Sequence, residues 1–132
     1  MLHHRRKDYF QRIIEEFFAK LVQKIMKNPG MTLSEKRELL NEGFDFYLSH
    51  FGVERSDNSI QIINKVEDID LIEYYARLLK IEYETIDIKY RDNLLKSLSL
   101  MDYLQRSDAS YSWERTILRE DILRLLEDAE SE

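Results

Sequence analysis

The chain has 132 residues, a net charge of −6, 35% charged residues and 43% hydrophobic residues. Only three glycines and one proline are present, which argues against a sandwich or a barrel, because such folds need turn residues about every ten positions. The absence of cysteine excludes disulfides, thiol nucleophiles and cysteine-ligated zinc or iron–sulfur sites. Composition and length therefore predict a single helical domain over residues 1–132. We expect residues 1–7 to form a mobile leader, and residues 130–132 to fray because acidic side chains oppose the dipole of a helix C-terminus.

Charge is distributed unevenly along the chain. Residues 1–27 contain seven Lys and Arg and three acidic residues, a net +4, which leaves −10 for the rest of the chain. An acidic protein disfavours phosphate contacts, so we expect no nucleic-acid partner, although the basic N-terminal segment keeps a nucleic-acid-associated role as an alternative. Charged residues interrupt every apolar run, so we expect no signal sequence, no membrane span or membrane partner, and a cytoplasmic location.

Two amphipathic helices are predicted at the start of the chain. Apolar pairs spaced by four residues run from Tyr9 to Met26, and the Asn-Pro-Gly run at 28–30 ends this first helix. A capping box formed by Thr32 and Glu35 begins the second helix, which we expect to continue to about residue 51, where Gly52 fits a left-handed C-cap.

The second helix carries two apolar stripes, which lie about 120° apart around its axis. The main stripe consists of Leu33, Leu40, Phe44, Tyr47, Leu48 and Phe51. The second stripe consists of Leu39, Gly43, Phe46 and His50. The second stripe is either enclosed in the core or exposed as a binding surface, and the sequence leaves both interpretations open.

The remaining chain predicts further helices. Residues 53–67 are compatible with a short helix capped by Ser56 or Asp57, or with a strand, and we expect the helix because no partner strand is predicted elsewhere. Longer helices are expected from a cap at Asp68 or Asp70 to about residue 86, over 88–105, and over 113–129 after a cap at Ser112. Short connections make sequential helices antiparallel neighbours, so the predicted fold class is all-α, with five to six helices in antiparallel hairpins.

The segment from Leu71 to Leu126 resembles a degenerate tetratricopeptide-like helical hairpin followed by a further helix. It departs from that repeat because small residues that allow close helix approach are scarce, with Ala76 and Ser97 as the best substitutes. The N-terminal run DYFQRIIEEFFAKLVQKIM and the turn DASYSWER at 108–115 are similar to a family of small bacterial all-helical proteins of uncharacterised function. This resemblance implies a tetratricopeptide-like all-α array and brings no activity with it.

Residue patterns for metal and cofactor binding are missing. Histidine occurs only at positions 3, 4 and 50, without the paired spacing of a zinc or di-iron site, so we expect no metal. The three glycines do not form a phosphate-binding loop, so we expect no cofactor. We assign no catalytic residue and expect no enzymatic activity, with an enzyme whose site is built from scattered Glu, Arg and Tyr residues as the alternative.

Two opposite charges fall on predicted apolar faces. Glu82 lies on the apolar stripe of the helix over 68–86, and Arg115 lies on the apolar side of the last helix. A buried charge is costly unless it is paired, so we expect a structural Glu82–Arg115 ion pair that fixes the docking of the last helix. A role for Glu82 as a catalytic acid would need a pocket and a second titrating group.

These patterns together predict a non-enzymatic helical module for protein–protein interaction, such as a scaffold, adaptor or assembly factor. Its partner is expected to be another protein or peptide, with self-association included. The candidate binding residues are Leu39, Phe46 and His50 on the second stripe, with acidic neighbours that would select a basic segment such as the N-terminal part of this same chain.

Overall fold

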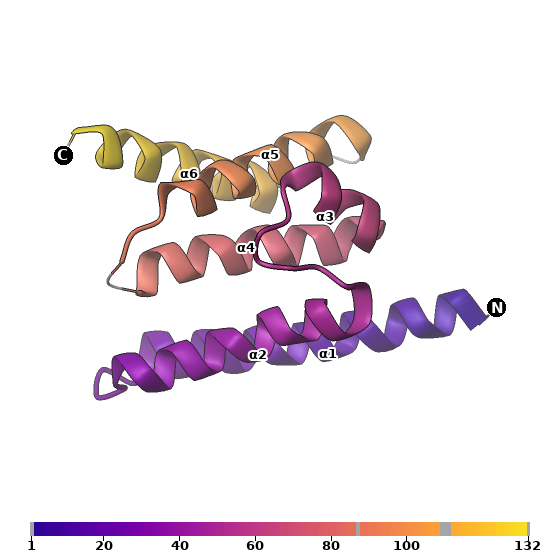
Figure 1. Ribbon diagram of the computed structural model, residues 1–132, viewed down its shortest axis with the longest axis horizontal. Coiled ribbons are helices and arrows are strands. Elements are labelled where there is room, and N and C mark those ends of the chain that lie inside the picture. The colour runs from indigo at the N-terminus through magenta and orange to yellow at the C-terminus, as the bar shows by residue number, and fades with distance from the viewer. Residues whose placement is uncertain (1, 87, 109–111, 132) are drawn as a thin grey trace. The chain divides into compact units, whose positions relative to one another are not determined.

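The computed structural model describes residues 2–86, 88–108 and 112–131, and the side chains among them from residue 8 to residue 130 (Figure 1). Within these ranges the chain is helical and has no strand, which confirms the predicted all-α class. The helices are α1 (Leu2–Lys27), α2 (Leu33–Phe51), α3 (Ser59–Val66), α4 (Ile69–Thr85), α5 (Arg91–Ser107) and α6 (Trp113–Ser131). Helix α1 includes most of the expected leader and α6 most of the expected tail, while residues 1 and 132 lie outside the described part of the chain.

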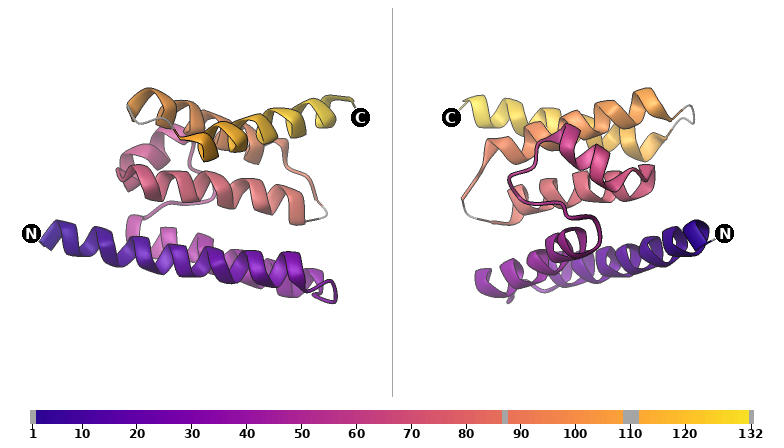
Figure 2. Two further views of the ribbon diagram at one scale, coloured as in Figure 1. Left: turned by 180° about the vertical axis from the view of Figure 1, so that it is seen from behind. Right: turned by 45° about the vertical axis from the view of Figure 1, so that its right-hand side comes forward.

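Contacts divide the chain into two compact units, Met1–Arg55 and Ser56–Glu132. The first unit contains α1 and α2, which run antiparallel to each other as a hairpin (Figure 2). The second unit contains α3 to α6, in which α4 packs against α5, α5 packs against α6, and α3 contacts both α4 and α5.

Local capping chemistry sets the ends of α2. The Thr32 hydroxyl accepts a hydrogen bond from the Glu35 backbone N–H at 3.1 Å, and the Glu35 carboxylate accepts one from the Thr32 N–H at 3.4 Å, which completes the predicted capping box. At the other end, Gly52 takes the left-handed conformation with φ 70° and donates its N–H to the carbonyl of Leu48. Both features are as predicted from sequence.

The structure confirms a short helix within residues 53–67 but moves its cap. Asn58, rather than Ser56 or Asp57, caps α3, because its side chain accepts from the Gln61 N–H at 2.9 Å while Gln61 accepts from the Asn58 N–H at 2.9 Å. Asp57 instead pairs with Lys65, with 2.6 Å between Oδ2 and Nζ. Residues 56, 57 and 58 are all good cap formers, so residue type alone does not decide among them, and the prediction of Ser56 or Asp57 was wrong.

The other boundaries follow the predicted caps except at α5. Asp68 caps α4 by accepting from the Leu71 N–H at 3.0 Å, and the Ser112 hydroxyl accepts from the Arg115 N–H at 3.2 Å at the start of α6. Helix α5 begins at Arg91, three residues later than predicted, and its N-cap residue Tyr90 makes no side-chain capping bond. A periodic apolar pattern without a capping residue does not fix where a helix begins.

The apolar core of the second unit lies along α4 and α5. Both helices turn their long aliphatic side chains inward, and the small residues Ala76 and Ser97 are fully buried among them. The fully or nearly fully buried side chains of this unit include Ile62, Leu71, Ile72, Tyr75, Leu78, Leu79, Leu94, Leu100, Met101, Leu104 and Ile122.

A candidate partner-binding groove between α1 and α2

A groove of about 320 Å³ lies between the two helices of the first unit. Its lining consists of Ile13, Ile14, Glu16, Phe17 and Lys20 from α1, and Glu42 and Phe46 from α2. The side chains of Ile13, Phe17 and Phe46 are half-buried, so their remaining surface is open to the groove. The lining is therefore mainly apolar, with charged side chains at its edge.

Helical spacing explains why α1 supplies this lining. Residues 14, 18 and 21 are buried and form the core-facing stripe of α1. Ile13 and Phe17 each precede a core residue by one position, which rotates them by about 100° from that stripe. The apolar pairs on α1 therefore cover two adjacent faces, one for the core and one for the groove.

An aromatic cluster joins the two helices beside the groove. The ring of Phe10 on α1 lies 6.0 Å from the ring of Phe46 in an edge-to-face arrangement, 4.7 Å from the ring of His50 and 5.5 Å from the ring of Phe51. Such pairs stabilise a helix contact by about 0.5–1.5 kcal/mol beyond the area they bury. This cluster fixes the position of Phe46 next to the groove.

The three binding residues predicted on the second stripe of α2 have different environments. Leu39 is buried, with 5% of its surface exposed. Phe46 is half-buried and lines the groove, while His50 is exposed and its ring contacts those of Phe10 and Phe46 at tilted angles. Of the three, the structure places only Phe46 in the groove.

Sequence reasoning missed the contribution of α1. Ile13 and Phe17 belong to the apolar pairs of that helix, and the sequence analysis did not single them out as binding residues. The available signal was the width of the apolar surface, since consecutive apolar residues at 13–14 and 17–18 cover more than one contact stripe.

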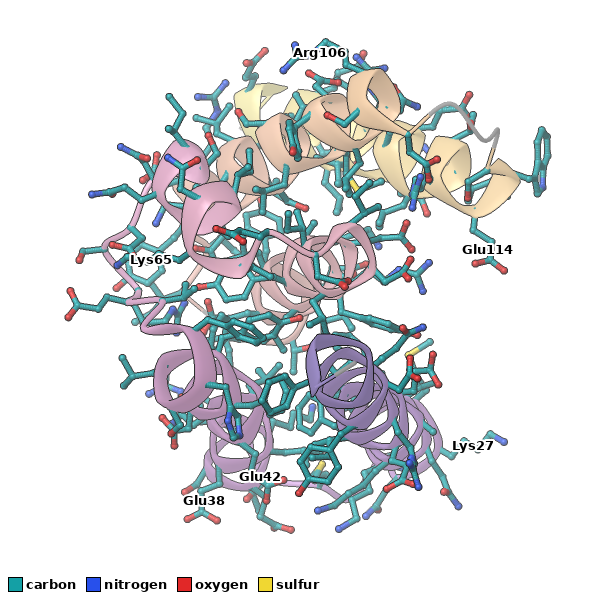
Figure 3. The ribbon with its side chains drawn as sticks, turned by 90° about the vertical axis from the view of Figure 1, so that its right-hand side faces the viewer. Lys27, Glu38, Glu42, Lys65, Arg106 and Glu114 are labelled. Carbon is teal, nitrogen blue, oxygen red and sulfur yellow. The ribbon has the colours of Figure 1, made fainter. Side chains whose placement is uncertain are left out.

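Lysines of α1 face glutamates of α2 over two turns of the groove edge. Lys20 of α1 pairs with Glu42 of α2 at 3.4 Å, and both side chains are about half exposed. One turn further along, Lys24 on α1 and Glu38 on α2 are exposed, and neither has an ion-pair partner among the described residues. Figure 3 shows Glu38 and Glu42 projecting from the same side of α2. At these turns one edge of the groove is thus acidic and the other carries lysines, while Glu16 lies one turn before Lys20 on the α1 edge.

The second unit contains a buried charge cluster centred on Arg115. Only 8% of the Arg115 side chain is exposed, and its guanidinium pairs with Glu73 of α4 and, at 2.6 Å, with Asp108. Glu73 also accepts from Arg77 at 2.8 Å, and Arg77 reaches the exposed Glu114 at 3.4 Å. The cluster ties the first turn of α6 to α4.

The electrostatics of the cluster are set by burial and by its carboxylates. Burial lowers the pKa of Arg115, but hydrogen bonds to Asp108 and Glu73, together with their negative charges, outweigh it, so the pKa is raised above its ordinary value. The guanidinium therefore stays charged and acts as a structural cation.

The predicted Glu82–Arg115 pair is corrected by this arrangement. Glu82 accepts a hydrogen bond from the side-chain amide of Asn93 on α5 at 2.6 Å, while Arg115 is held by Glu73 and Asp108. Glu73 and Glu82 are nine residues apart, which places them on opposite sides of α4 at about 100° per residue. Arg115 is paired, as predicted, but its partner on α4 is Glu73 and not Glu82, which lies on the opposite side of that helix.

The described residues contain no group of three His, Cys, Asp or Glu side chains that is arranged to hold a metal ion. The side chains of His3 and His4 lie outside the described part of the chain. Among the described helices, none has the length and apolar character needed to cross a membrane. No protein-family model, curated protein or solved structure matches this chain.

Proposed function

We propose that this protein is a non-enzymatic helical module that binds another protein through the groove between α1 and α2. The observation that carries the proposal is the apolar lining of the groove by Ile13, Phe17 and Phe46, each half-buried and supplied by two antiparallel helices. A groove of this kind receives the apolar side chains of an amphipathic helix, which are spaced at three and four residues. A cysteine-free chain suits the reducing cytoplasm, where we propose that it acts as a scaffold, adaptor or assembly factor.

The chemistry of the groove favours a protein ligand over a small polar substrate. Its apolar side chains offer contact area, whereas its charged residues lie at the edge, and Lys20 and Glu42 there neutralise each other at 3.4 Å. Interfaces between proteins have the same arrangement, with an apolar centre and a polar rim. Aromatic side chains such as Phe17 and Phe46 are frequent energetic centres of such interfaces.

The proposal is tested with a display library of random peptides about 16 residues long, which is panned against the whole protein. Selected peptides should carry apolar residues at helical spacing, and in a nuclear magnetic resonance titration they should shift the signals of Ile13, Phe17 and Phe46. Phe17→Ala should weaken binding about tenfold or more, because it removes an aromatic wall of the groove.

Met26→Ala is the matched control, because Met26 is also an apolar residue of α1 but is 77% exposed and does not line the groove. The control should leave peptide binding unchanged. Peptides that shift signals elsewhere, or that bind Phe17→Ala as well as the unchanged protein, would contradict the proposal.

A further inference from the structure

We infer that the partner in the groove is a second copy of this chain, packed groove to groove so that α1 of each copy lies along α2 of the other. This inference rests on the proposed function, since it names the occupant of the same groove. The assembly is a four-helix bundle built from two copies of the α1–α2 hairpin. Charge, geometry and area each support this occupant.

Charge complementarity distinguishes a second copy from an arbitrary apolar helix. The groove edge on α2 carries Glu38 and Glu42, and the edge on α1 carries Lys20 and Lys24 over the facing turns, with Glu16 one turn before Lys20. The same asymmetry extends along the chain, with +4 on residues 1–27 and −10 on the rest. A surface with an acidic pair on one edge and a basic pair at the same level on the other edge is complementary to itself at those turns when it is turned by a two-fold rotation.

The antiparallel hairpin determines which two-fold rotation brings opposite charges together. Lys20 and Glu42 lie at the same level of the hairpin, because they form an ion pair at 3.4 Å. A two-fold axis parallel to the helices keeps each residue at the same height along the hairpin and places α1 of one copy opposite α2 of the other. It therefore sets Lys20 and Lys24 of one copy against Glu42 and Glu38 of the other.

This rotation also gives favourable helix packing. Because α1 and α2 are antiparallel within a copy, α1 of one copy is antiparallel to α2 of the other, as in up-and-down bundles. Phe17 and Phe46 then lie at the centre of the contact with their symmetry mates. The alternative axis, perpendicular to the helices, sets α1 against α1 and brings no acidic edge to the lysines.

The available area is sufficient for a dimer of moderate affinity. Helix α2 has 19 residues, so the paired part of the hairpin is about 28 Å long, and two adjacent helices are about 20 Å wide. The projected face is then about 560 Å², so two faces bury about 1,100 Å² or more, close to the lower end of stable interfaces.

The experiment uses two charge-reversed variants of the whole chain, mixed in one tube. Lys20→Glu with Lys24→Glu makes both edges acidic, and Glu38→Lys with Glu42→Lys makes both edges basic. Each variant alone should associate about tenfold or more weakly than the unchanged protein, because every charge contact across the dimer becomes repulsive. An equimolar mixture should restore the dimer as a heterodimer, since each lysine again faces a glutamate.

Association is measured by sedimentation equilibrium from about 1 to 200 µM. Far-ultraviolet circular dichroism and thermal unfolding establish that each variant is folded. Arg106→Glu with Arg124→Glu is the control with the same change in net charge as the α1 variant, at exposed positions on α5 and α6, and it should dimerise like the unchanged protein. In the mixture each chain carries the same charges as it does alone, so any association that is restored comes from the contact between the two copies.

A dimer of the unchanged protein that is lost in both variants and restored by mixing is the result expected. A monomer throughout this concentration range overturns the inference, and so does a dimer that survives both reversals or is not restored by mixing. The peptide titration described above tests the same groove, where a peptide and the second copy would compete. A monomer whose groove binds peptides would refute the second copy and leave the proposed function intact.

Discussion

The hydroxyl of Ser97 on α5 donates a hydrogen bond to the backbone carbonyl of Ala76 on α4, with 2.7 Å between the oxygens. Both residues are fully buried. Small side chains at these two positions allow the helices to approach closely enough for a serine to reach the backbone of its neighbour. They are also the two residues that resembled the small positions of a tetratricopeptide-like hairpin.

The first prediction concerns this contact. Ser97→Ala removes a buried hydrogen bond without adding volume, so the free energy of unfolding should fall by about 1 kcal/mol relative to the same change at Ser99, which is exposed on the same helix. Ser97→Leu should cost about 1–3 kcal/mol or more, because the close approach leaves no room for the added methyl groups. Urea unfolding followed by circular dichroism measures both values, and equal effects at the two serines would show that the bond contributes nothing.

The second prediction concerns the ion pair between Arg115 and Glu73. Arg115→Met removes one of the two cationic partners of Glu73, whose side chain is 15% exposed and keeps Arg77 at 2.8 Å, so the free energy of unfolding should fall by about 1.5–3 kcal/mol. Arg124→Met, at a position that is 69% exposed, should change it by less than about 0.5 kcal/mol.

A double-mutant cycle identifies the partner of Arg115. Arg115→Met should couple strongly to Glu73→Gln and be additive with Glu82→Gln. Coupling to Glu82 and additivity with Glu73 would reverse the assignment. Because the pKa of Arg115 is raised, its contribution is lost only as the pH rises through that pKa, so the cost of Arg115→Met should be equal at about pH 6 and about pH 9.

The third prediction compares two glycines. Gly52 has φ 70° and open space around its added Cβ, so Gly52→Ala should destabilise the protein by about 1 kcal/mol through backbone strain alone. Gly30 has no positive φ, and an added Cβ would lie 3.7 Å from the nearest side-chain atom, at ordinary contact distance. Gly30→Ala should therefore be neutral or stabilise by up to about 1 kcal/mol, because it restricts the unfolded chain. Thermal unfolding of the two variants side by side checks the difference in sign.

The fourth prediction concerns Glu67, which ends α3 in the left-handed region with φ 66°. A side chain with a Cβ is strained there, so Glu67→Gly should raise the free energy of unfolding by about 0.5–1 kcal/mol. Asn64→Gly, at an exposed position inside the same helix, should lower it by about 0.3 kcal/mol. Urea unfolding of both variants measures the two changes. A loss of stability in Glu67→Gly would mean that the glutamate side chain contributes more than the strain costs.

The local sequence was sufficient to predict the helices and most of their ends. Thr32 with Glu35, Gly52, Asp68 and Ser112 act on backbone groups within four residues of themselves, so their roles could be recognised without knowledge of the fold. Where several cap formers stand together before α3, or where none stands before α5, the same reasoning misplaced the boundary.

Tertiary packing decided which side of each helix meets another element. Glu73 and Glu82 lie on opposite sides of α4, and only the path of α6 selects Glu73 as the partner of Arg115. In the same way, the pairing of α1 with α2 separates apolar neighbours in sequence, because Ile14 is fully buried while Ile13 and Phe17 keep part of their surface open to the groove. The spacing of apolar residues indicates that a helix face is apolar. Which element covers that face depends on residues distant in the chain, and a local sequence pattern contains no information about them.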